Sequence, residues 1–410
     1  MWVLLALGIA LLLVVLAPRL RWPQTVGYLA AALLLTLAGT AGPSHGALTL
    51  WHAAFASGTL AFVAAVCAVF VLSGQLQEAG ALADLTRAAS VRLNSARARA
   101  AVLPAIIGLL PMPGGAVVSA PMVEECGSGT REEQHFTNYW FRHIWEIWWP
   151  LYPPVLLAAE LAHIPLLPFC LLLAPLMAFM VVIGVVWILR PLPALESQRR
   201  EHGSMSSVAL ALGLMLITAP ALALAGPELV PVSREWHVTL AVLPAVAFLT
   251  LRHGWLSLQR TLTSRRLWAL VAMAASIKLF GSMVEGSGAA SEASEMAARF
   301  HAAWSGVILL PLLAGLATGN TVAAVSLSFP LVGALALVRD SGADGRIFLF
   351  AVAYASGFVG YLLSPVHMCF VLSARYFGAE LARGLSKLLL PVAAFGLLSA
   401  AWFLMWSALS

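Results

Sequence analysis

Long runs of hydrophobic residues follow one another along the chain, separated by short polar segments in which arginine is frequent. A helix that crosses a lipid bilayer needs about 20 predominantly apolar residues. By that criterion the runs predict ten membrane-spanning helices, at residues 2–17, 24–41, 55–74, 136–163, 165–189, 207–226, 237–251, 267–284, 347–373 and 388–407. The pattern therefore predicts an all-α polytopic membrane protein.

Two further hydrophobic segments, 100–123 and 303–338, are interrupted near their middle by glycine-containing sequences. The interrupting residues are Pro113, Gly114 and Gly115 in the first segment, and Thr318, Gly319, Asn320 and Thr321 in the second. Because glycine permits sharp reversals of the backbone, we interpret both segments as re-entrant hairpins. The two ends of such a hairpin lie on the same side of the membrane.

The basic residues predict how the chain is oriented, because cytoplasmic loops carry an excess of Lys and Arg. If the N-terminus lies outside and neither hairpin crosses the membrane, most basic residues fall in cytoplasmic segments. Arg92, Arg131 and Arg199 are examples. A full crossing by either hairpin would invert the alternation after it. We therefore expect a multi-pass protein of a bacterial inner membrane, with both termini in the periplasm.

Similar short sequences recur at an offset of about 210 residues, which indicates an internal repeat. The matching positions are Gly74 with Gly281, Ser119 with Ser328, and Pro153 with Pro365. The repeat predicts a first unit at 1–190 with spans 1–5, a cytoplasmic linker at 191–206, and a second unit at 207–410 with spans 6–10. The first spans of the two units run in opposite directions, which is the inverted-topology arrangement of many secondary transporters.

The amino-acid composition indicates which kinds of molecule surround or bind the protein. Hydrophobic residues make up 61% of the chain and charged residues only 10%, whereas soluble domains contain about 25% charged residues. The formal net charge is +5, but the basic residues are spread between the hydrophobic runs rather than gathered on one face. The charge therefore indicates membrane topology and not nucleic-acid binding. The expected surroundings are a lipid bilayer.

The cysteines lie far apart and form no Cys-x-x-Cys motif, so we interpret them as small packing residues rather than as metal ligands or disulfide partners. They are Cys67, Cys126, Cys170 and Cys369. No organic cofactor is expected, and the bound ion that we expect is Na⁺.

The candidate substrate-binding site lies at four predicted breaks in the membrane segments. These are the two hairpin tips and one break in each of two spans. Non-helical backbone is stable at membrane depth only where protein, water or a ligand forms hydrogen bonds with its N–H and C=O groups. Helix N-termini at such breaks attract anions, and freed carbonyl groups coordinate cations. The predicted substrate-binding residues are Pro113, Gly114, Gly115, Tyr152, Pro153, Thr318, Gly319, Asn320, Thr321, Ser364, Pro365 and His367. The alternative interpretation is that these are ordinary kinks and packing glycines.

Ionisable residues inside spans are costly and are therefore functional candidates. Arg142, His143 and Glu146 precede the predicted break in the fourth span. In one interpretation, Arg142 or His143 meets an anionic substrate group while Glu146 carries a coupling proton. In the other, Arg142 and Glu146 neutralise each other on one helix face, because residues four apart are neighbours there.

The two hairpin tips, together with the hairpin and broken-helix order of each half, resemble the ion transporter superfamily, which includes gluconate permeases and sodium-coupled dicarboxylate and citrate carriers. A bacterial branch of it has a similar Pro-Met-Pro-Gly-Gly hairpin. The resemblance implies a homodimer with a fixed scaffold and a mobile transport domain that works by an elevator mechanism. The dicarboxylate carriers have Ser-Asn-Thr at each tip. Here Asn320 and Thr321 retain two of these three residues, and the first tip retains none.

The sequence therefore predicts a secondary active transporter of a small organic anion, coupled to Na⁺ or H⁺, and not an enzyme. Asn320, Thr321 and Ser364 are the candidate ligands of a Na⁺ ion. Two alternatives are a channel and an intramembrane metal-dependent enzyme. The spacing of His143 and Glu146 suggests the second, because it could place two metal ligands on one helix face.

Overall fold

The computed structural model describes residues 2–80, 93, 95–109, 115–127, 129–192, 213, 236–300 and 302–409. The secondary-structure elements in these residues are helices. Those of the first half are α1 (Trp2–Leu16), α2 (Gln24–Ala38), α3 (Pro43–Phe55), α4 (Ser57–Glu78), α6 (Ala96–Gly108), α7 (Gly115–Glu125), α8 (Arg131–Arg142), α9 (Pro153–Ala162), α10 (Leu166–Ile183) and the π-helix η1 (Gly184–Leu189). Those of the second half are α12 (His237–His253), α13 (Trp255–Leu262), α14 (Arg265–Gly286), α15 (Ala289–Arg299), α16 (Ala303–Thr318), α17 (Thr321–Ala334), α18 (Ala336–Arg339), α19 (Ala343–Leu362), α20 (Met368–Phe377) and α21 (Leu381–Leu409).

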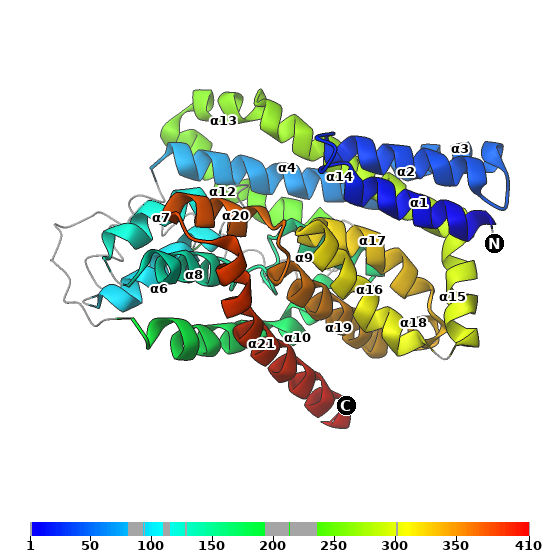
Figure 1. Cartoon of the computed structure of the whole chain (residues 1–410). Coiled ribbons are helices and arrows are strands. Elements are labelled where there is room, and N and C mark those ends of the chain that lie inside the picture. The colour runs from blue at the N-terminus through cyan, green and yellow to red at the C-terminus, as the bar shows by residue number, and fades with distance from the viewer. Residues whose placement is uncertain are drawn as a thin grey trace.

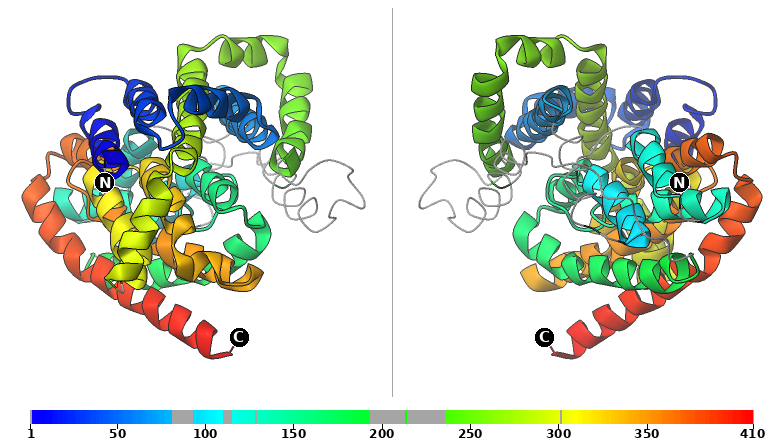
Figure 2. Two further views of the ribbon diagram at one scale, coloured as in Figure 1. Left: turned by 90° about the vertical axis from the view of Figure 1, so that its right-hand side faces the viewer. Right: turned by 90° about the vertical axis from the view of Figure 1, so that its left-hand side faces the viewer.

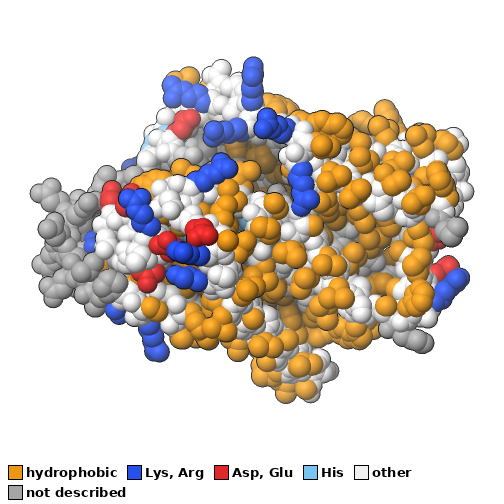
Figure 3. Space-filling model, in the orientation of Figure 1, with side chains coloured by type: hydrophobic (Ala, Val, Ile, Leu, Met, Phe, Trp, Pro, Cys, Tyr) orange, Lys and Arg blue, Asp and Glu red, His pale blue; other side chains and the backbone are white. Residues whose placement is uncertain are grey.

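Five of these helical segments are long and apolar enough to cross a membrane: α4, the continuous segment Leu166–Leu189, α14, α19 and α21. Seven shorter helices are also apolar: α1, α2, α9, α12, α16, α17 and α20. Hydrophobic side chains cover much of the molecular face in Figure 3. The fold is therefore that of a multi-pass helical membrane protein, as the hydrophobic runs predict.

The helices form two groups. In the first, α14 packs against α2, α3 and α4, and α12 and α13 also pack against α4. The second, which we call the hairpin group, contains α6–α10 and α16–α21. Figure 1 shows α1–α4, α13 and α14 above the hairpin group, and Figure 2 shows the same arrangement from two further sides. The hairpin group contains all the predicted substrate-binding residues that the structure describes.

The contact between the two groups is partly polar. Lys278 of α14 places its Nζ atom 2.9 Å from Oε1 of Glu160 in α9. The hydroxyl groups of Tyr28 and Ser326 lie 2.7 Å apart and are buried. Gly281 keeps the helices close, because a Cβ atom there would lie 3.2 Å from the side chain of Leu161. These contacts fix α14 against α9, and α2 against α17.

Local sequence signals set several helix ends. Thr130 and Glu133 form a capping box that starts α8, and Ser264 accepts a hydrogen bond from the backbone of Leu267 at the start of α14. Pro153 occupies the first turn of α9, where its missing N–H costs no helical hydrogen bond. Gly319 ends α16 with φ +58°, a left-handed conformation that suits glycine.

The predicted spans agree with the helices over most of the chain, and the differences have local causes. The segment 136–163 is not one helix: polar α8 and apolar α9 share it, with ten non-helical residues between them. The segment 347–373 is likewise divided between α19 and α20. The short helices α3, α13 and α15 were not predicted, because their hydrophobic runs are short. The predicted span 207–226 lies outside the described residues except for Gly213, and the predicted linker 191–206 except for 191 and 192.

Both halves place the same elements in the same order. A helix pair (α6 and α7, or α16 and α17) precedes a broken pair (α8 and α9, or α19 and α20), and one long helix follows (α10 or α21). The packing is also reciprocal, since α7 packs against α20 and α17 packs against α9. The inverted repeat and its boundary between residues 190 and 207 remain predictions.

Candidate functional site

The first break begins where α8 ends, at Arg142, and lasts until Pro153. His143 Nδ1 lies 2.5 Å from the carbonyl oxygen of Tyr139, the group that would accept the next helical hydrogen bond. The backbone N–H of His143 bonds instead to Trp140. An imidazole has thus replaced the backbone amide at this carbonyl, which ends the helix earlier than the prolines predict. The prediction that Arg142 and Glu146 share a helix face is therefore wrong, because residues 143–148 form turns.

Arg142 lies buried at this break, with 1% of its surface exposed. Its guanidinium group contacts Gly115, the first residue of α7, where an added Cβ atom would overlap it. Both the guanidinium charge and the N-terminal end of α7 favour a negative group at this position. The sequence analysis assigned Arg142 and Gly115 to two separate breaks. The structure brings the two residues into contact.

Glu146 lies beside Arg142 without a hydrogen bond between the two side chains. The distance from Glu146 Oε1 to Arg142 Nη1 is 3.9 Å, which exceeds the hydrogen-bond range. Tyr361 donates a hydrogen bond of 2.8 Å to Glu146 Oε2, and Tyr354 donates one of 2.9 Å to the backbone carbonyl of Glu146. The Glu146 carboxylate therefore connects the first break to α19 of the second half.

The second break is shorter and lies against the tip of the second hairpin. It comprises the residues between Leu362 and Met368. Ser364 donates a hydrogen bond of 2.7 Å to the carbonyl of Leu316 in α16. A Cβ atom at Gly319 would lie 2.7 Å from the backbone nitrogen of His367, so only glycine fits there. The predicted tip and the predicted break thus form one junction.

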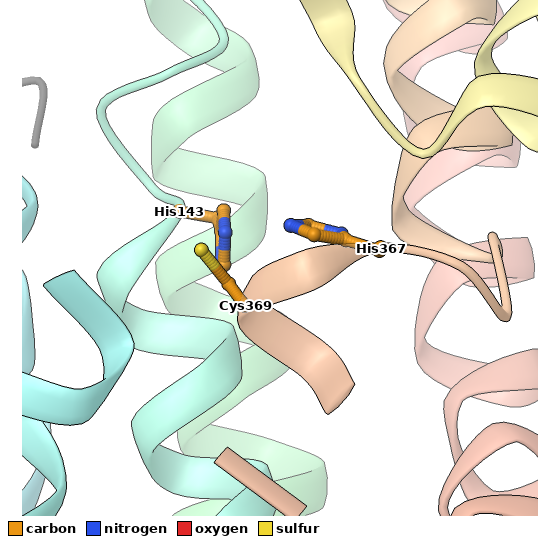
Figure 4. Close-up of side chains that lie close together, drawn as sticks. All are labelled: His143, His367 and Cys369. Atoms are coloured by element: carbon orange, nitrogen blue, oxygen red, sulfur yellow. The ribbon is translucent and has the colours of Figure 1, made fainter. Parts of the chain in front are cut away.

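The two breaks meet through their histidines. His367 and His143 place their ring centroids 4.9 Å apart, and Tyr139 lies between them and α20. Figure 4 shows both imidazole rings and the side chain of Cys369 directed towards the same space. His143 is fully buried and His367 is 2% exposed. The structure therefore joins His143 and His367, which the sequence assigned to different breaks, and adds Cys369.

Two of the three predicted Na⁺ ligands, Asn320 and Ser364, make side-chain hydrogen bonds to backbone groups of the second hairpin. Asn320 Oδ1 accepts a hydrogen bond of 3.1 Å from the backbone N–H of Ala323 and so caps α17. Thr318 donates one of 2.7 Å to Ala314. Thr321 is buried at the start of α17, and Ser364 lies beside Gly319. Asn320, Thr321 and Ser364 are therefore close to one hairpin tip, and their binding of Na⁺ remains a prediction.

The remaining predicted residues occupy the first break or lie outside the described part. Tyr152 donates a hydrogen bond to the carbonyl oxygen of Gly108, which ties the break to the end of α6. Pro153 begins α9, and Pro365 lies within the second break. Pro113 and Gly114 lie outside the described residues.

Sequence reasoning missed three side chains at this site. Tyr139, Tyr361 and Cys369 all contact or face the two histidines. The spacing of Tyr139 and His143, one helical turn apart, was a local signal that could have found the first. Cys369 carried no such signal, because its nearness to His143 arises only from the packing of α20 against α8.

The comparisons with known proteins agree with this architecture. The family described as "Protein of unknown function (DUF401)" matches residues 31–405. No curated protein sequence shows significant similarity to the chain. Among solved structures, the YdaH transporter of Alcanivorax borkumensis, described as having an unusual topology, is similar with a TM-score of 0.52 and 13% sequence identity. The match covers 91% of this chain and 90% of that one, so the two share a fold.

Proposed function

The chain belongs to the DUF401 family, and from that premise and the site geometry we propose that it is a secondary active transporter of a small organic anion. The observation that carries the proposal is the buried guanidinium of Arg142 against the N-terminus of α7, inside a broken helix. Ionisable side chains at membrane depth are functional candidates. Glu146 lies 3.9 Å from the guanidinium, and an organic carboxylate would bind the same guanidinium beside the N-terminus of α7.

The arrangement of the breaks supports transport over catalysis. The second hairpin tip, Gly115 at the start of α7 and two helix breaks converge on one region of the hairpin group, and such a region is the usual location of a transporter's binding site. The solved structure with the same fold is described as that of a transporter. The similar order of elements in the two halves supports an inverted repeat, and an elevator movement of the hairpin group follows from it as part of the proposal.

The distribution of charge supports the proposed orientation. On the face in Figure 3, Lys and Arg side chains gather towards the end of the molecule at which α7 and α13 lie. The N-terminus lies at the opposite end (Figure 1). Because positive residues accumulate on the cytoplasmic side, this arrangement supports an inner-membrane protein with a periplasmic N-terminus. A periplasmic C-terminus, a homodimeric state and coupling to Na⁺ or H⁺ complete the proposal.

Counterflow in proteoliposomes tests the proposal. The purified protein is reconstituted and assayed with radiolabelled gluconate, succinate and citrate as probes. We expect saturable exchange of at least one probe by the wild type. Arg142→Gln removes the guanidinium and should reduce this exchange about 100-fold, because a charge-assisted hydrogen bond contributes about 1.5 to 3 kcal/mol.

Arg131→Gln is the matched control, because Arg131 lies at the other end of the same helix and is exposed. It should leave exchange unchanged. Arg142→Lys keeps the charge and distinguishes loss of charge from loss of folding, as does the melting temperature of each variant. Exchange of none of the probes by the wild type, or equal exchange by Arg142→Gln, would overturn the proposal. Unitary currents in a planar bilayer would also overturn it and indicate a channel.

A further inference from the structure

We propose that His143, His367 and Cys369 form a binding site for a thiophilic d¹⁰ metal cation, Zn²⁺ or Cu⁺. The ligands would be Nε2 of each histidine and Sγ of the cysteine. The proposal does not depend on transport, because it concerns resident binding of the ion by the folded protein.

The three side chains are already close. One potential ligand atom from each lies within 4.8 Å of those of the other two. Around a tetrahedral ion with Zn–N bonds of about 2.0 Å and Zn–S bonds of about 2.3 Å, two nitrogen atoms and one sulfur atom are about 3.3 to 3.5 Å apart. The site therefore needs to contract by about 1 Å, which side-chain rotation can provide.

The hydrogen bonds of the two histidines leave the correct nitrogen available. The Nδ1–H of His143 donates to the carbonyl oxygen of Tyr139, since a carbonyl can only accept. The hydroxyl of Tyr139 donates to the carbonyl of Leu362 at 2.9 Å, so it accepts from His367 Nδ1, which lies 2.8 Å away. Each imidazole thus carries its proton on Nδ1 and presents a lone pair on Nε2. Metal-binding histidines typically have this outer hydrogen bond.

Both Nε2 atoms also lack a hydrogen-bond partner among the described residues. A buried polar atom without a partner is rare in native proteins and calls for an explanation such as an ion. The His367 ring points towards the His143 ring from the other helix break (Figure 4), and the two ring planes are inclined at 78°. A cation between the rings would satisfy both atoms at once.

The chemistry of the ligands selects the kind of ion. Two imidazoles and one thiolate suit Zn²⁺ or Cu⁺ and disfavour Mg²⁺ or Ca²⁺, which prefer oxygen. Binding releases the thiol proton of Cys369 to solvent, since the thiolate is the ligand. Cys369 is half-buried as a residue. Glu146 offsets the charge of Arg142 next to the site.

The described residues offer three protein ligands, and with these three a bound Zn²⁺ would retain an open fourth position. The ion would also join the two halves of the chain, because His143 follows α8 whereas His367 and Cys369 belong to the start of α20. A ligand that binds the folded state and not the unfolded state raises the melting temperature. Metal binding should therefore stabilise the protein.

The metal content of protein without a polyhistidine tag tests the proposal. The detergent-purified chain is dialysed against Zn²⁺, or against Cu⁺ under reducing conditions, and then against metal-free buffer. We expect one equivalent of either ion, a higher melting temperature, and no retention of Mg²⁺. With Co²⁺ as a probe, a thiolate-to-cobalt charge-transfer band should appear. Cys369→Ser should abolish that band and weaken metal binding by more than about 100-fold, since loss of an outer partner alone costs 10- to 100-fold.

Two control variants make the result specific. His135→Gln changes another buried histidine of α8, whose Nε2 also lacks a partner among the described residues. Cys170→Ser changes another buried cysteine. Both should retain the equivalent of metal and the cobalt band. Absence of metal and of the band in the wild type, or their equal loss in the controls, would overturn the proposal. Even if Cys369→Ser failed to fold, the wild-type band would decide the outcome.

Discussion

The two hairpin junctions of this protein share a layout but not a chemistry. In the second half, α16 packs on α19 backbone to backbone: a Cβ atom at Gly360 would overlap the carbonyl oxygen of Leu312, and one at Gly315 would overlap that of Gly357. In the first half, Gly108 faces the backbone carbonyl of Arg142, whereas Gly115 faces its guanidinium group. The second junction is closed by main-chain packing at these glycines, and the first combines such packing with a buried charge.

Because of this difference, we expect substitutions at the two junctions to have different effects. Backbone contacts at several glycines bring α16 close to α19 and fix the second hairpin to its broken helix. A long charged side chain can change its rotamer and its partner, and so can respond to an anion. The first break is also the longer one, with ten residues between α8 and α9. We therefore expect substitution of the glycines between α16 and α19 to act on folding, and substitution of Arg142 to act on substrate.

The largest expected effect is on stability, from Gly360→Ala. The added methyl group has no space beside Leu312 in the middle of α16, so we expect a loss of about 3 kcal/mol. The melting temperature in detergent, followed by size-exclusion chromatography after heating, measures it. Gly108→Ala should cost less, because the carbonyl that it meets belongs to the last residue of α8, next to turns that can shift.

Gly396→Ala is the matched control for these glycine variants. Its Cβ atom would meet only a side-chain methyl of Val359, at 3.9 Å, which is ordinary contact. Its melting temperature should stay close to that of the wild type. A Gly360→Ala variant as stable as Gly396→Ala would show that α16 and α19 are not fixed together as described.

An intermediate effect is expected at Glu146, where the first break contacts the second half. Glu146 Oε1 makes no hydrogen bond to Arg142, and an amide can still accept from Tyr361. Glu146→Gln should therefore fold normally. If Glu146 carries the coupling proton, this variant loses proton-driven accumulation of the anion but keeps exchange. Accumulation, exchange and melting temperature are measured on the same preparation.

Tyr361→Phe is the control for Glu146, because it removes the hydrogen bond and keeps the carboxyl group. It should retain accumulation. A Glu146→Gln variant that folds poorly would instead assign the residue to a structural ion pair with Arg142, since an uncompensated buried charge is strongly destabilising. Normal accumulation in Glu146→Gln would remove it from the coupling role.

The smallest expected effect is the loss of the α17 cap. Asn320→Ala removes the side-chain oxygen that accepts from Ala323, which should cost about 1 kcal/mol of stability. If Asn320 also binds Na⁺, the variant loses sodium-stimulated uptake. Ser264→Ala removes the equivalent cap of α14 and should lower stability alone. Equal uptake by the two variants would leave Asn320 with a capping role and no Na⁺.

The sequence by itself determined the class of the protein and the places where its helices break. Apolar runs of membrane length and the low charged fraction leave a lipid-embedded helical fold as the stable solution. Gly319, Pro153 and Pro365 could be predicted at breaks because glycine and proline act on their own turn of backbone, whatever packs around them. The predicted hairpin 303–338 accordingly matches α16, α17 and α18.

Only the tertiary structure decided which breaks and which charges meet. The early end of α8 depends on an imidazole taking the carbonyl of Tyr139. The pairing of Lys278 with Glu160, and the approach of Cys369 to His143, join residues from opposite halves of the chain. Periodicity and turn signals describe only neighbours along the sequence. Contacts between distant segments follow from how whole helices pack, so these residues could be recognised as a site only after the two broken helices were placed side by side.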